Sequence, residues 1–260
     1  MKKALIIGGG FSGCTAAYML KEKNFDVTII EGSNNLGGGV RTMSYYGHPY
    51  TFGPHHLLVN YDEMYVWEYF EKFLELRELK HHTLTFVGSD SEFYNYPIHV
   101  DEVKEMPDYE KIKSELDNKG DISKSENFEE YWINSIGNTL YDKFIHQYSE
   151  KMWGVKNNQE IDEFSFSPKG KPLQTGSKQC FVDQKKIGYP VRLDGYNTYF
   201  DKTTEGVNVI YNSIVEQFDL ENKRVKVADD WISADVVINT ASLDSVFDYC
   251  YGELRFIGRD

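Results

Sequence analysis

The chain has 260 residues, 40% of them hydrophobic, and a formal net charge of −13. It can therefore bury a sizeable core, and its length fits one large domain or two smaller ones. The excess of negative charge argues against a general binder of nucleic acid or of anionic membranes, so any phosphate recognition must be local. The three cysteines lack CxxC spacing, which leaves neither a disulfide framework nor a zinc site and fits a reducing cytoplasm. No segment has the long apolar run of a membrane span.

The first 31 residues predict a dinucleotide-binding βαβ unit. Two segments of strand composition, 3–7 and 25–30, flank a helical segment, and a glycine-rich turn precedes the helix. In that turn, Gly8 would close the first strand and Gly10 would let a pyrophosphate approach the backbone. Gly13 would let the helix pack close to the strands.

The residues around this turn complete the expected phosphate and ribose site. Phe11 and Ser12 belong to the same turn, and the helix that follows would direct its N–H groups and positive dipole at the phosphates. Glu31, at the end of the second strand, would accept hydrogen bonds from the adenosine ribose hydroxyls and disfavour a 2′-phosphate. A merely tight turn is the alternative, but strand, helix and acid all stand at the spacing of a real site.

A second glycine cluster occupies residues 36–42. Gly38, Gly39 and Arg41 would add backbone N–H groups and a fixed cation near the same pyrophosphate. NAD-only dehydrogenases do not usually have such a cluster, so it favours FAD; a flexible surface loop is the alternative reading.

Two adjacent histidines, His55 and His56, follow in an extended segment. Neighbouring side chains on extended backbone point to opposite faces, so the pair cannot bind one metal or one ligand. We expect one of them to face the site, and no metal.

The rest of the chain predicts helices in the middle and strands toward the end. We expect an amphipathic helix over 61–79, strands over 83–87 and 92–96, helices over 109–116, 128–136 and 139–152, loops and irregular strands over 161–199, a short helix over 196–203, and strands over 207–211, 214–220, 224–227 and 235–240. This order indicates an α/β fold, a Rossmann-like FAD-binding domain interrupted by a helical insert and a small antiparallel sheet region. The expected domains are 1–80 with 200–260 for FAD, 101–160 for a helical substrate domain, and 81–100 with 161–199 for a small sheet and loop domain.

Three further motifs follow the glycine clusters: Asn-Tyr-Pro-Ile at 95–98, Gln-Tyr-Ser-Glu-Lys-Met-Trp-Gly at 147–154, and Gly-Tyr-Pro-Val at 188–191. In this order they make nearly the whole chain resemble the UDP-galactopyranose mutase family, which includes dTDP-fucopyranose mutases. Such proteins are flavoenzymes of cell-surface polysaccharide synthesis that interconvert the pyranose and furanose forms of a nucleotide-activated sugar.

The resemblance implies an isomerase that works with reduced FAD. Flavin N5 would act as the nucleophile on the anomeric carbon, while the protein positions the two atoms and excludes water. The residues of the two glycine clusters and Glu31 would hold FAD, and His55 would lie near the isoalloxazine. Asn95, Phe144, Tyr148 and Trp153 fall where the family contacts the nucleotide sugar. The alternative for Phe144 and Tyr148 is that, four residues apart, they line a buried helix face.

Several departures from the family pattern bear on the substrate. Met152 stands where a Gln usually precedes the Trp, and Leu58 replaces a second His. Gln174 is nearest to the position of an arginine that binds the substrate diphosphate. The cations that could substitute are Lys178, Lys185, Lys186 and Arg192, although a lysine lacks the bidentate fork. A UDP-linked or a dTDP-linked sugar therefore stays open, with dTDP-fucopyranose mutase as the alternative function.

The resemblance also implies a further segment beyond Phe256, with additional flavin and diphosphate contacts, whereas this chain ends at Asp260. We therefore expect a truncated form that is poorly stable and binds FAD weakly or not at all. The chain could also be an inactive remnant, or an amine-oxidase-like FAD oxidoreductase, a class that shares the glycine clusters. The expected binding partner is the nucleotide sugar, the expected location is the cytoplasm, and a homodimer is a hypothesis.

Overall fold

The computed structural model describes residues 1–53, 56–162, 173–180 and 185–254. They form two compact units, one of residues 1–79 together with 186–254, and one of residues 80–185. The expected division into three domains stays a prediction. Within the described ranges, no helix combines the length and the apolar composition that crossing a bilayer requires.

The first unit is built on a four-stranded parallel sheet in the order β10–β2–β1–β14. Its strands are β1 (Lys2–Ile7), β2 (Phe25–Ile30), β10 (Asn208–Ile210) and β14 (Val236–Asn239). The two outer strands come from the last quarter of the chain, so both ends of the sequence build one sheet. The predicted Rossmann-like α/β fold is thereby confirmed.

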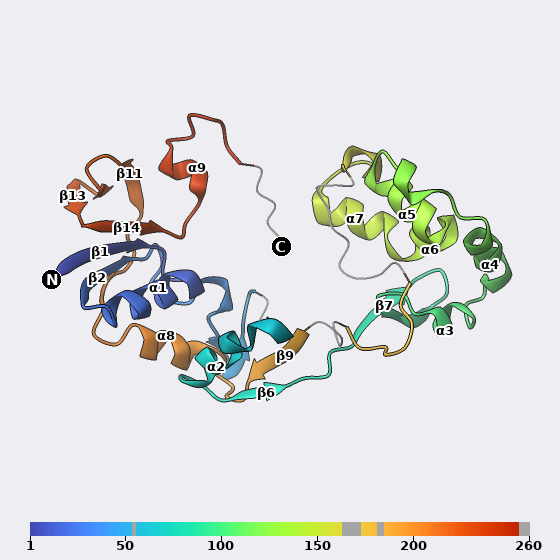
Figure 1. The fold of residues 1–260 in the computed structure, drawn as a ribbon, viewed down its shortest axis with the longest axis horizontal. Coiled ribbons are helices and arrows are strands. Elements are labelled where there is room, and N and C mark those ends of the chain that lie inside the picture. Colours follow the sequence, from blue (N-terminus) through green and yellow to red (C-terminus); the bar gives the residue numbers. More distant parts are fainter. Residues whose placement is uncertain (54–55, 163–172, 181–184, 255–260) are drawn as a thin grey trace. The chain divides into compact units, whose positions relative to one another are not determined.

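The two faces of this sheet are covered differently because successive side chains of a strand alternate between them. Ala4 and Ile6 pack toward α1 (Phe11–Lys21) and α8 (Asn197–Thr203). Leu5 and Ile7 pack toward an antiparallel sheet of the strands β11 (Val215–Asp219), β12 (Arg224–Val227) and β13 (Asp230–Ser233). Figure 1 shows the helices on one side of the parallel sheet and the antiparallel sheet on the other.

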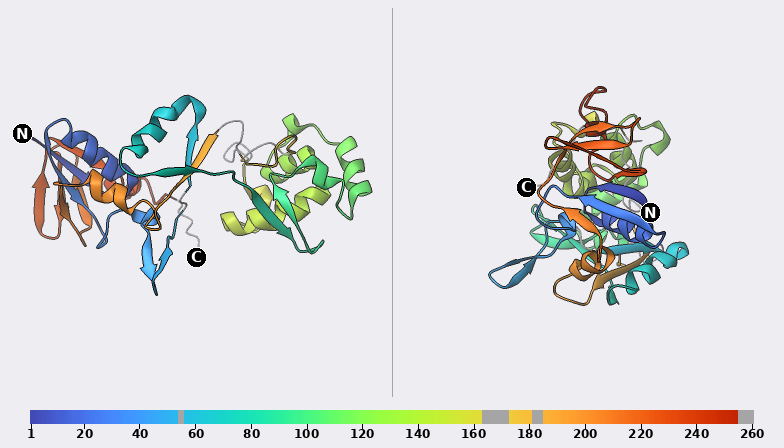
Figure 2. Two further views of the ribbon diagram at one scale, coloured as in Figure 1. Left: turned by 90° about the horizontal axis from the view of Figure 1, so that it is seen from below. Right: turned by 90° about the vertical axis from the view of Figure 1, so that its left-hand side faces the viewer.

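The remaining elements of the first unit come from two stretches of the sequence, one between β2 and the second unit and one after the second unit. They are the hairpin β3 (Met43–Tyr45) and β4 (His48–Tyr50), helix α2 (Met64–Glu71), the sheet of β5 (Leu57–Asn60), β9 (Lys185–Pro190) and β6 (Leu76–Glu78), and the short helix α9 (Leu243–Val246). The hairpin, light blue in Figure 2, projects from the rest of the unit.

The expectation of one helix over 61–79 is wrong. The segment starts with a 3₁₀ turn at Tyr61–Glu63, and α2 ends at Glu71. Leu76–Glu78 instead forms a strand that pairs antiparallel with β9. Pairing with a strand so distant in the sequence outweighs the helical pattern of the segment itself.

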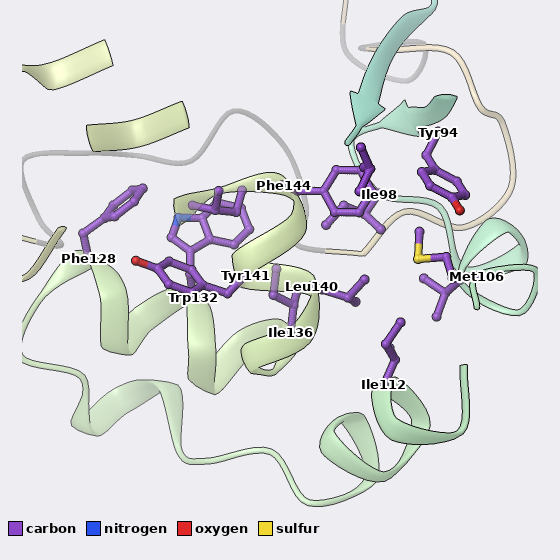
Figure 3. Packing of buried hydrophobic residues seen from close by; sticks show 13 residues of the cluster. Tyr94, Ile98, Met106, Ile112, Phe128, Trp132, Ile136, Leu140, Tyr141 and Phe144 are labelled. Carbon is purple, nitrogen blue, oxygen red and sulfur yellow. The ribbon is translucent and has the colours of Figure 1, made fainter. Parts of the chain in front are cut away.

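The second unit is a β-hairpin packed on helices. The hairpin strands are β7 (Thr83–Val87) and β8 (Glu92–Tyr96), and the helices are α3 (Val100–Val103), α4 (Tyr109–Asp117), α5 (Phe128–Ile136), α6 (Asn138–Phe144) and α7 (His146–Trp153). Figure 3 shows their shared core, in which Tyr94 and Ile98 pack with Ile112, Trp132 and Phe144.

The predicted helix over 139–152 is two helices, because the backbone turns at Ile145, where φ is −116°. The boundary between α5 and α6 is set by Gly137, whose φ of +82° lies in the region that favours glycine. A Cβ there would also lie 2.7 Å from Glu115 Cβ.

A buried ion cluster joins the hairpin to the helices of the second unit. Lys143 on α6 pairs with Asp90 in the hairpin turn and, at 2.9 Å, with Asp108. The side chains of Lys143 and Asp90 are only 6% and 3% exposed. Burial alone would raise the pKa of Asp90, but hydrogen bonds from Lys143, Ser89 and Tyr94 outweigh it and hold that pKa below its usual value.

Replacing Lys143 by Met should leave the Asp90 carboxylate buried without its cation. We expect the free energy of unfolding of the second unit to fall by about 3–5 kcal/mol, measured by hydrogen exchange of peptides from α5 and α6 in increasing urea. The control is Lys113→Met, which removes an exposed pair with Asp117 at 2.8 Å and should change stability far less. Equal losses in the two variants would contradict this role of the cluster.

The same cluster predicts a pH dependence. Because the pKa of Asp90 is lowered in the folded protein, its stabilising contribution is present above the unfolded pKa and is lost as pH falls through the folded pKa. The stability difference between the native chain and Lys143→Met should therefore shrink in acid, which urea titrations at several pH values would measure. A difference that grows on acidification is the contrary result.

Candidate functional site

The turn between β1 and α1 has the tight geometry that the sequence predicts. Gly8 has a φ of +95°, and its N–H donates to the Ile30 carbonyl at 2.9 Å, which extends the pairing of β1 with β2. A Cβ on Gly13 would lie 1.9 Å from the Gly8 carbonyl oxygen. Helix α1 can therefore begin directly against the end of β1 only with glycine at this position.

Gly10 faces open space. A Cβ on this residue would meet no atom within 4 Å. Gly10 is also the N-cap residue of α1, and it has no side chain that could accept a hydrogen bond from the first helical N–H groups. The first turn of the helix has no acidic residue. The first N–H groups of a helix lack intrahelical partners, so those at Phe11, Ser12 and Gly13 are available to an anion. This opening fits a pyrophosphate that approaches the backbone.

Glu31, directly after β2, stabilises the turn through hydrogen bonds of its carboxylate. Its Oε2 accepts from the Gly9 N–H at 2.7 Å, and its Oε1 accepts from the Ser33 N–H at 2.8 Å. Each carboxylate oxygen can accept more than one hydrogen bond. Glu31 can therefore hold the glycine turn and still accept a ribose hydroxyl.

The second glycine cluster lies against the first. The Gly37 N–H donates to the Gly9 carbonyl at 2.8 Å. A Cβ on Gly38 would lie 3.7 Å from Gly10 Cα, and Gly39 follows in the same 3₁₀ turn. The structure thus brings together two segments that the sequence analysis assigns to one pyrophosphate.

Arg41 and Phe11 are held by other parts of the first unit. An Arg41 guanidinium nitrogen lies 3.6 Å from the Asp201 carboxylate, and the Arg41 backbone bridges to Gly195. The Phe11 ring packs edge-on against Tyr196, with centroids 4.9 Å apart. Phe11 would therefore offer a cofactor its backbone and not its ring.

Cys14, the second residue after Ser12, is buried beside this site and stays neutral. Its Sγ donates to the Gly9 carbonyl at 3.2 Å. Burial, and next the charge of Glu31, raise the pKa of the Cys14 thiol to about 12 against the opposing effect of Arg41. The thiol therefore adds no negative charge where phosphates would bind.

Thr240 is a site residue that the sequence analysis missed. Its hydroxyl donates to the Ile7 carbonyl at 2.8 Å, and a Cβ on Gly8 would lie 2.5 Å from the Thr240 hydroxyl oxygen. Thr240 closes the turn from the carboxyl end of β14, 232 residues away in the sequence. Its only local signal is its place at the end of a predicted strand.

In the second unit, one carboxylate fixes Asn95. The Asn95 N–H donates to Glu102 at 2.6 Å, its side-chain amide donates to the same carboxylate, and Lys178 pairs with that carboxylate at 2.9 Å. Burial would raise the pKa of Glu102, but Lys178 and Asn95 hold it below its usual value. Asn95 is thus presented in one orientation.

The aromatic residues expected at the substrate lie in different environments. Phe144 is 4% exposed, and its ring packs 6.0 Å from that of Tyr94 in the core seen in Figure 3. Tyr148 is 61% exposed, and Trp153 is half-buried at the end of α7. The alternative of one buried helix face for Phe144 and Tyr148 is wrong, because α6 ends between them. Substrate contacts of these residues and of Asn95 stay predictions.

His55 lies outside the described residues. Its neighbour His56 contacts Tyr189 of β9 edge-on, with ring centroids 6.1 Å apart. Across the part of the chain that the structure describes, no three His, Cys, Asp or Glu side chains gather into a metal site.

The cations considered as substitutes at the diphosphate are mostly paired. Besides Lys178, Lys186 lies 3.7 Å from Glu78 and 4.0 Å from the centre of the Trp67 ring. Arg192 makes a two-point contact with Asp194 at 2.9 and 3.2 Å, and its side chain is still 67% exposed.

Comparison with known proteins extends these observations. A family model described as an NAD(P)-binding Rossmann-like domain matches residues 6–73, and one described as UDP-galactopyranose mutase matches residues 143–260. A dTDP-fucopyranose mutase of Escherichia coli is 26% identical over 98% of this chain and 67% of its own length. A probable UDP-galactopyranose mutase of Klebsiella pneumoniae is 24% identical over 98% of this chain and 64% of its own length.

A crystal structure of reduced UDP-galactopyranose mutase has the same fold. It superposes with a TM-score of 0.74 at 19% identity, over 94% of this chain and 56% of that protein. The chain thus spans about two thirds of the curated relatives and just over half of the solved structure. The two family models, and the two mutases that align over 98% of this chain, agree with the order of motifs, and the chain is similar to the UDP-galactopyranose mutase family.

Proposed function

We propose, against the weak or absent FAD binding expected for a truncated form, that this chain holds FAD between its two glycine clusters and serves as a flavin-dependent isomerase that interconverts the pyranose and furanose forms of a nucleotide sugar. The observation that carries the proposal is the contact of the two clusters at the carboxyl edge of the parallel sheet, with open space at Gly10. Carboxyl edges of parallel strands are where dinucleotides bind in such folds. The UDP-galactopyranose mutase and dTDP-fucopyranose mutase relatives support the reaction.

Different groups of the chain would bind different parts of FAD. The N–H groups at the start of α1 would bind the pyrophosphate, and Glu31 would orient the adenosine ribose. Arg41, whose pairing with Asp201 is long at 3.6 Å, would add a cation. When bound, reduced FAD supplies a nucleophile for the anomeric carbon of the sugar. His55 is proposed to lie beside the flavin ring.

We propose that residues of the second unit contact the nucleotide-sugar substrate. Asn95, held by Glu102, offers a fixed amide, while the exposed Tyr148 and the half-buried Trp153 offer aromatic surface to a pyrimidine base. Phe144 would support these residues from the core. UDP-galactose and a dTDP-linked 6-deoxy sugar are the two candidates, and the product would be a furanose for cell-surface polysaccharide made in the cytoplasm. A homodimer stays a hypothesis.

Gly10→Ala tests the cofactor site without disturbing the fold. The new methyl group has room in the protein itself but occupies the space of the pyrophosphate, so FAD and ADP should bind about ten to a hundred times more weakly. Calorimetric titration would measure both ligands. The control is Gly88→Ala, a turn glycine of the second unit whose Cβ would also meet no atom within 4 Å.

Unchanged ADP and FAD affinity in Gly10→Ala, with native stability, would contradict the proposed site. Gly13→Ala is unsuitable for this test, because its methyl group would collide with the Gly8 carbonyl oxygen and unfold the turn.

The reaction itself separates a mutase from an oxidase that shares the glycine clusters. With FAD reduced by dithionite, we expect UDP-galactofuranose or dTDP-fucofuranose to be converted to its pyranose form. Chromatography of the nucleotide sugars would measure this conversion. No electron acceptor should be consumed. In a separate aerobic assay without dithionite, oxygen uptake in step with substrate loss would favour an amine-oxidase-like activity. No conversion of either sugar by the chain loaded with reduced flavin would refute the mutase function.

A further inference from the structure

A chain of three hydroxyl groups connects the first turn of α1 to two other helices of the first unit. Its members are Tyr69 of α2, Tyr199 of α8 and Thr15 of α1. The Tyr199 hydroxyl oxygen lies 3.3 Å from that of Tyr69 and 2.5 Å from that of Thr15. The Thr15 hydroxyl in turn lies 2.7 Å from the carbonyl oxygen of Phe11, the first residue of α1.

Tyr199, in the middle of this hydroxyl chain, is surrounded by aromatic side chains. It is 0% exposed, and the ring centroids of Phe11, Phe70 and Phe73 lie 5.0 to 5.3 Å from its own. Burial raises the pKa of Tyr199 and also that of Tyr69, so each hydroxyl keeps its proton. A buried hydroxyl without a partner is costly, so the contacts with Thr15 and Tyr69 stabilise Tyr199 in this place.

The direction of the hydroxyl chain follows from its last acceptor. Each hydroxyl has one proton to donate, whereas a carbonyl can only accept. Thr15 therefore donates to the Phe11 carbonyl, and its oxygen must accept from Tyr199. Tyr199 must then accept from Tyr69. All three O–H groups thus point along the chain toward the Phe11 carbonyl.

The Phe11 carbonyl belongs to the same planar peptide group as the Ser12 N–H. Ser12 is exposed in the first turn of α1, where N–H groups lack partners within the helix. A hydrogen bond that the carbonyl accepts polarises the peptide group, and aligned hydrogen bonds strengthen one another in a medium of low dielectric constant. The Ser12 N–H should therefore be a stronger donor to an anion than the same amide without the hydroxyl chain.

We propose that Tyr69, Tyr199 and Thr15 are positioning residues that strengthen the Ser12 N–H as a donor to the pyrophosphate of a bound dinucleotide. This inference rests on the proposed function, in which FAD is that dinucleotide. The three hydroxyls act from behind the helix, through the peptide group that joins Phe11 to Ser12, and do not touch the ligand.

Thr15→Val removes the hydroxyl that reaches the Phe11 carbonyl and keeps the shape of the side chain. We expect ADP to bind about two to five times more weakly in calorimetric titration, because the Ser12 N–H loses its added polarisation. Thr15→Ser retains a hydroxyl and should rescue ADP binding. The control is Tyr18→Phe, a change on the same helix in a ring 5.0 Å from that of Phe73, with a hydroxyl outside the chain. It should leave ADP affinity unchanged.

The double variant Thr15→Val with Tyr199→Phe separates this effect from a loss of stability. Thr15→Val alone leaves the buried Tyr199 hydroxyl without its acceptor and should lower the urea midpoint of unfolding. Removing both hydroxyls removes that unpaired group, so the midpoint should return toward the native value while ADP binding stays weak. Recovery of ADP affinity together with stability would show a purely structural role and overturn the inference.

The Ser12 amide reports the polarisation in the ligand-free protein. In NMR spectra, its proton resonance should move upfield in Thr15→Val and in Tyr199→Phe, and should keep its place in Tyr18→Phe. An unmoved Ser12 resonance in the first two variants would overturn the inference, and so would native ADP affinity in Thr15→Val. Absence of ADP binding by the native chain, with the Ser12 shift present, would instead contradict the proposed function and the ligand that this inference takes from it.

Discussion

The close approach of α1 to the end of β1 is the constraint on which the proposed site depends. A Cβ on Gly13 would lie 1.9 Å from the Gly8 carbonyl oxygen, so only glycine allows the helix to begin there. Once the helix start is fixed, its N–H groups and dipole point into the open space at Gly10. The turn is then hydrogen-bonded to three separate segments of the chain. The residues involved are Glu31 directly after β2, Gly37 in the second glycine cluster, and Thr240 after β14.

The order of the strands explains why distant parts of the chain meet at this turn. The sheet order β10–β2–β1–β14 combines the first two strands of the chain with two late ones, and the second unit is inserted between them. Parallel strands end at the same edge, so the turn after β1, the acid after β2 and the threonine after β14 come together.

Local patterns predicted most of the fold. The helix Phe128–Ile136 agrees with the sequence prediction, because its ends are set by local groups, the Asn127 cap and Gly137. Strand β6 was not predicted, because its partner β9 is remote in the sequence, and the turn at Ile145 has no Gly or Pro to mark it. The glycine clusters are likewise local and could be recognised from the sequence, whereas the contact of Thr240 with the turn after β1 joins residues 232 positions apart and required the fold.

A crystal structure of this chain with ADP bound would test the central claim most directly. We predict pyrophosphate oxygens within about 2.7–3.2 Å of the N–H groups at the start of α1, and the ribose hydroxyls at Glu31. Well-ordered ADP at another place, with the space beside Gly10 filled only by solvent, would contradict the account.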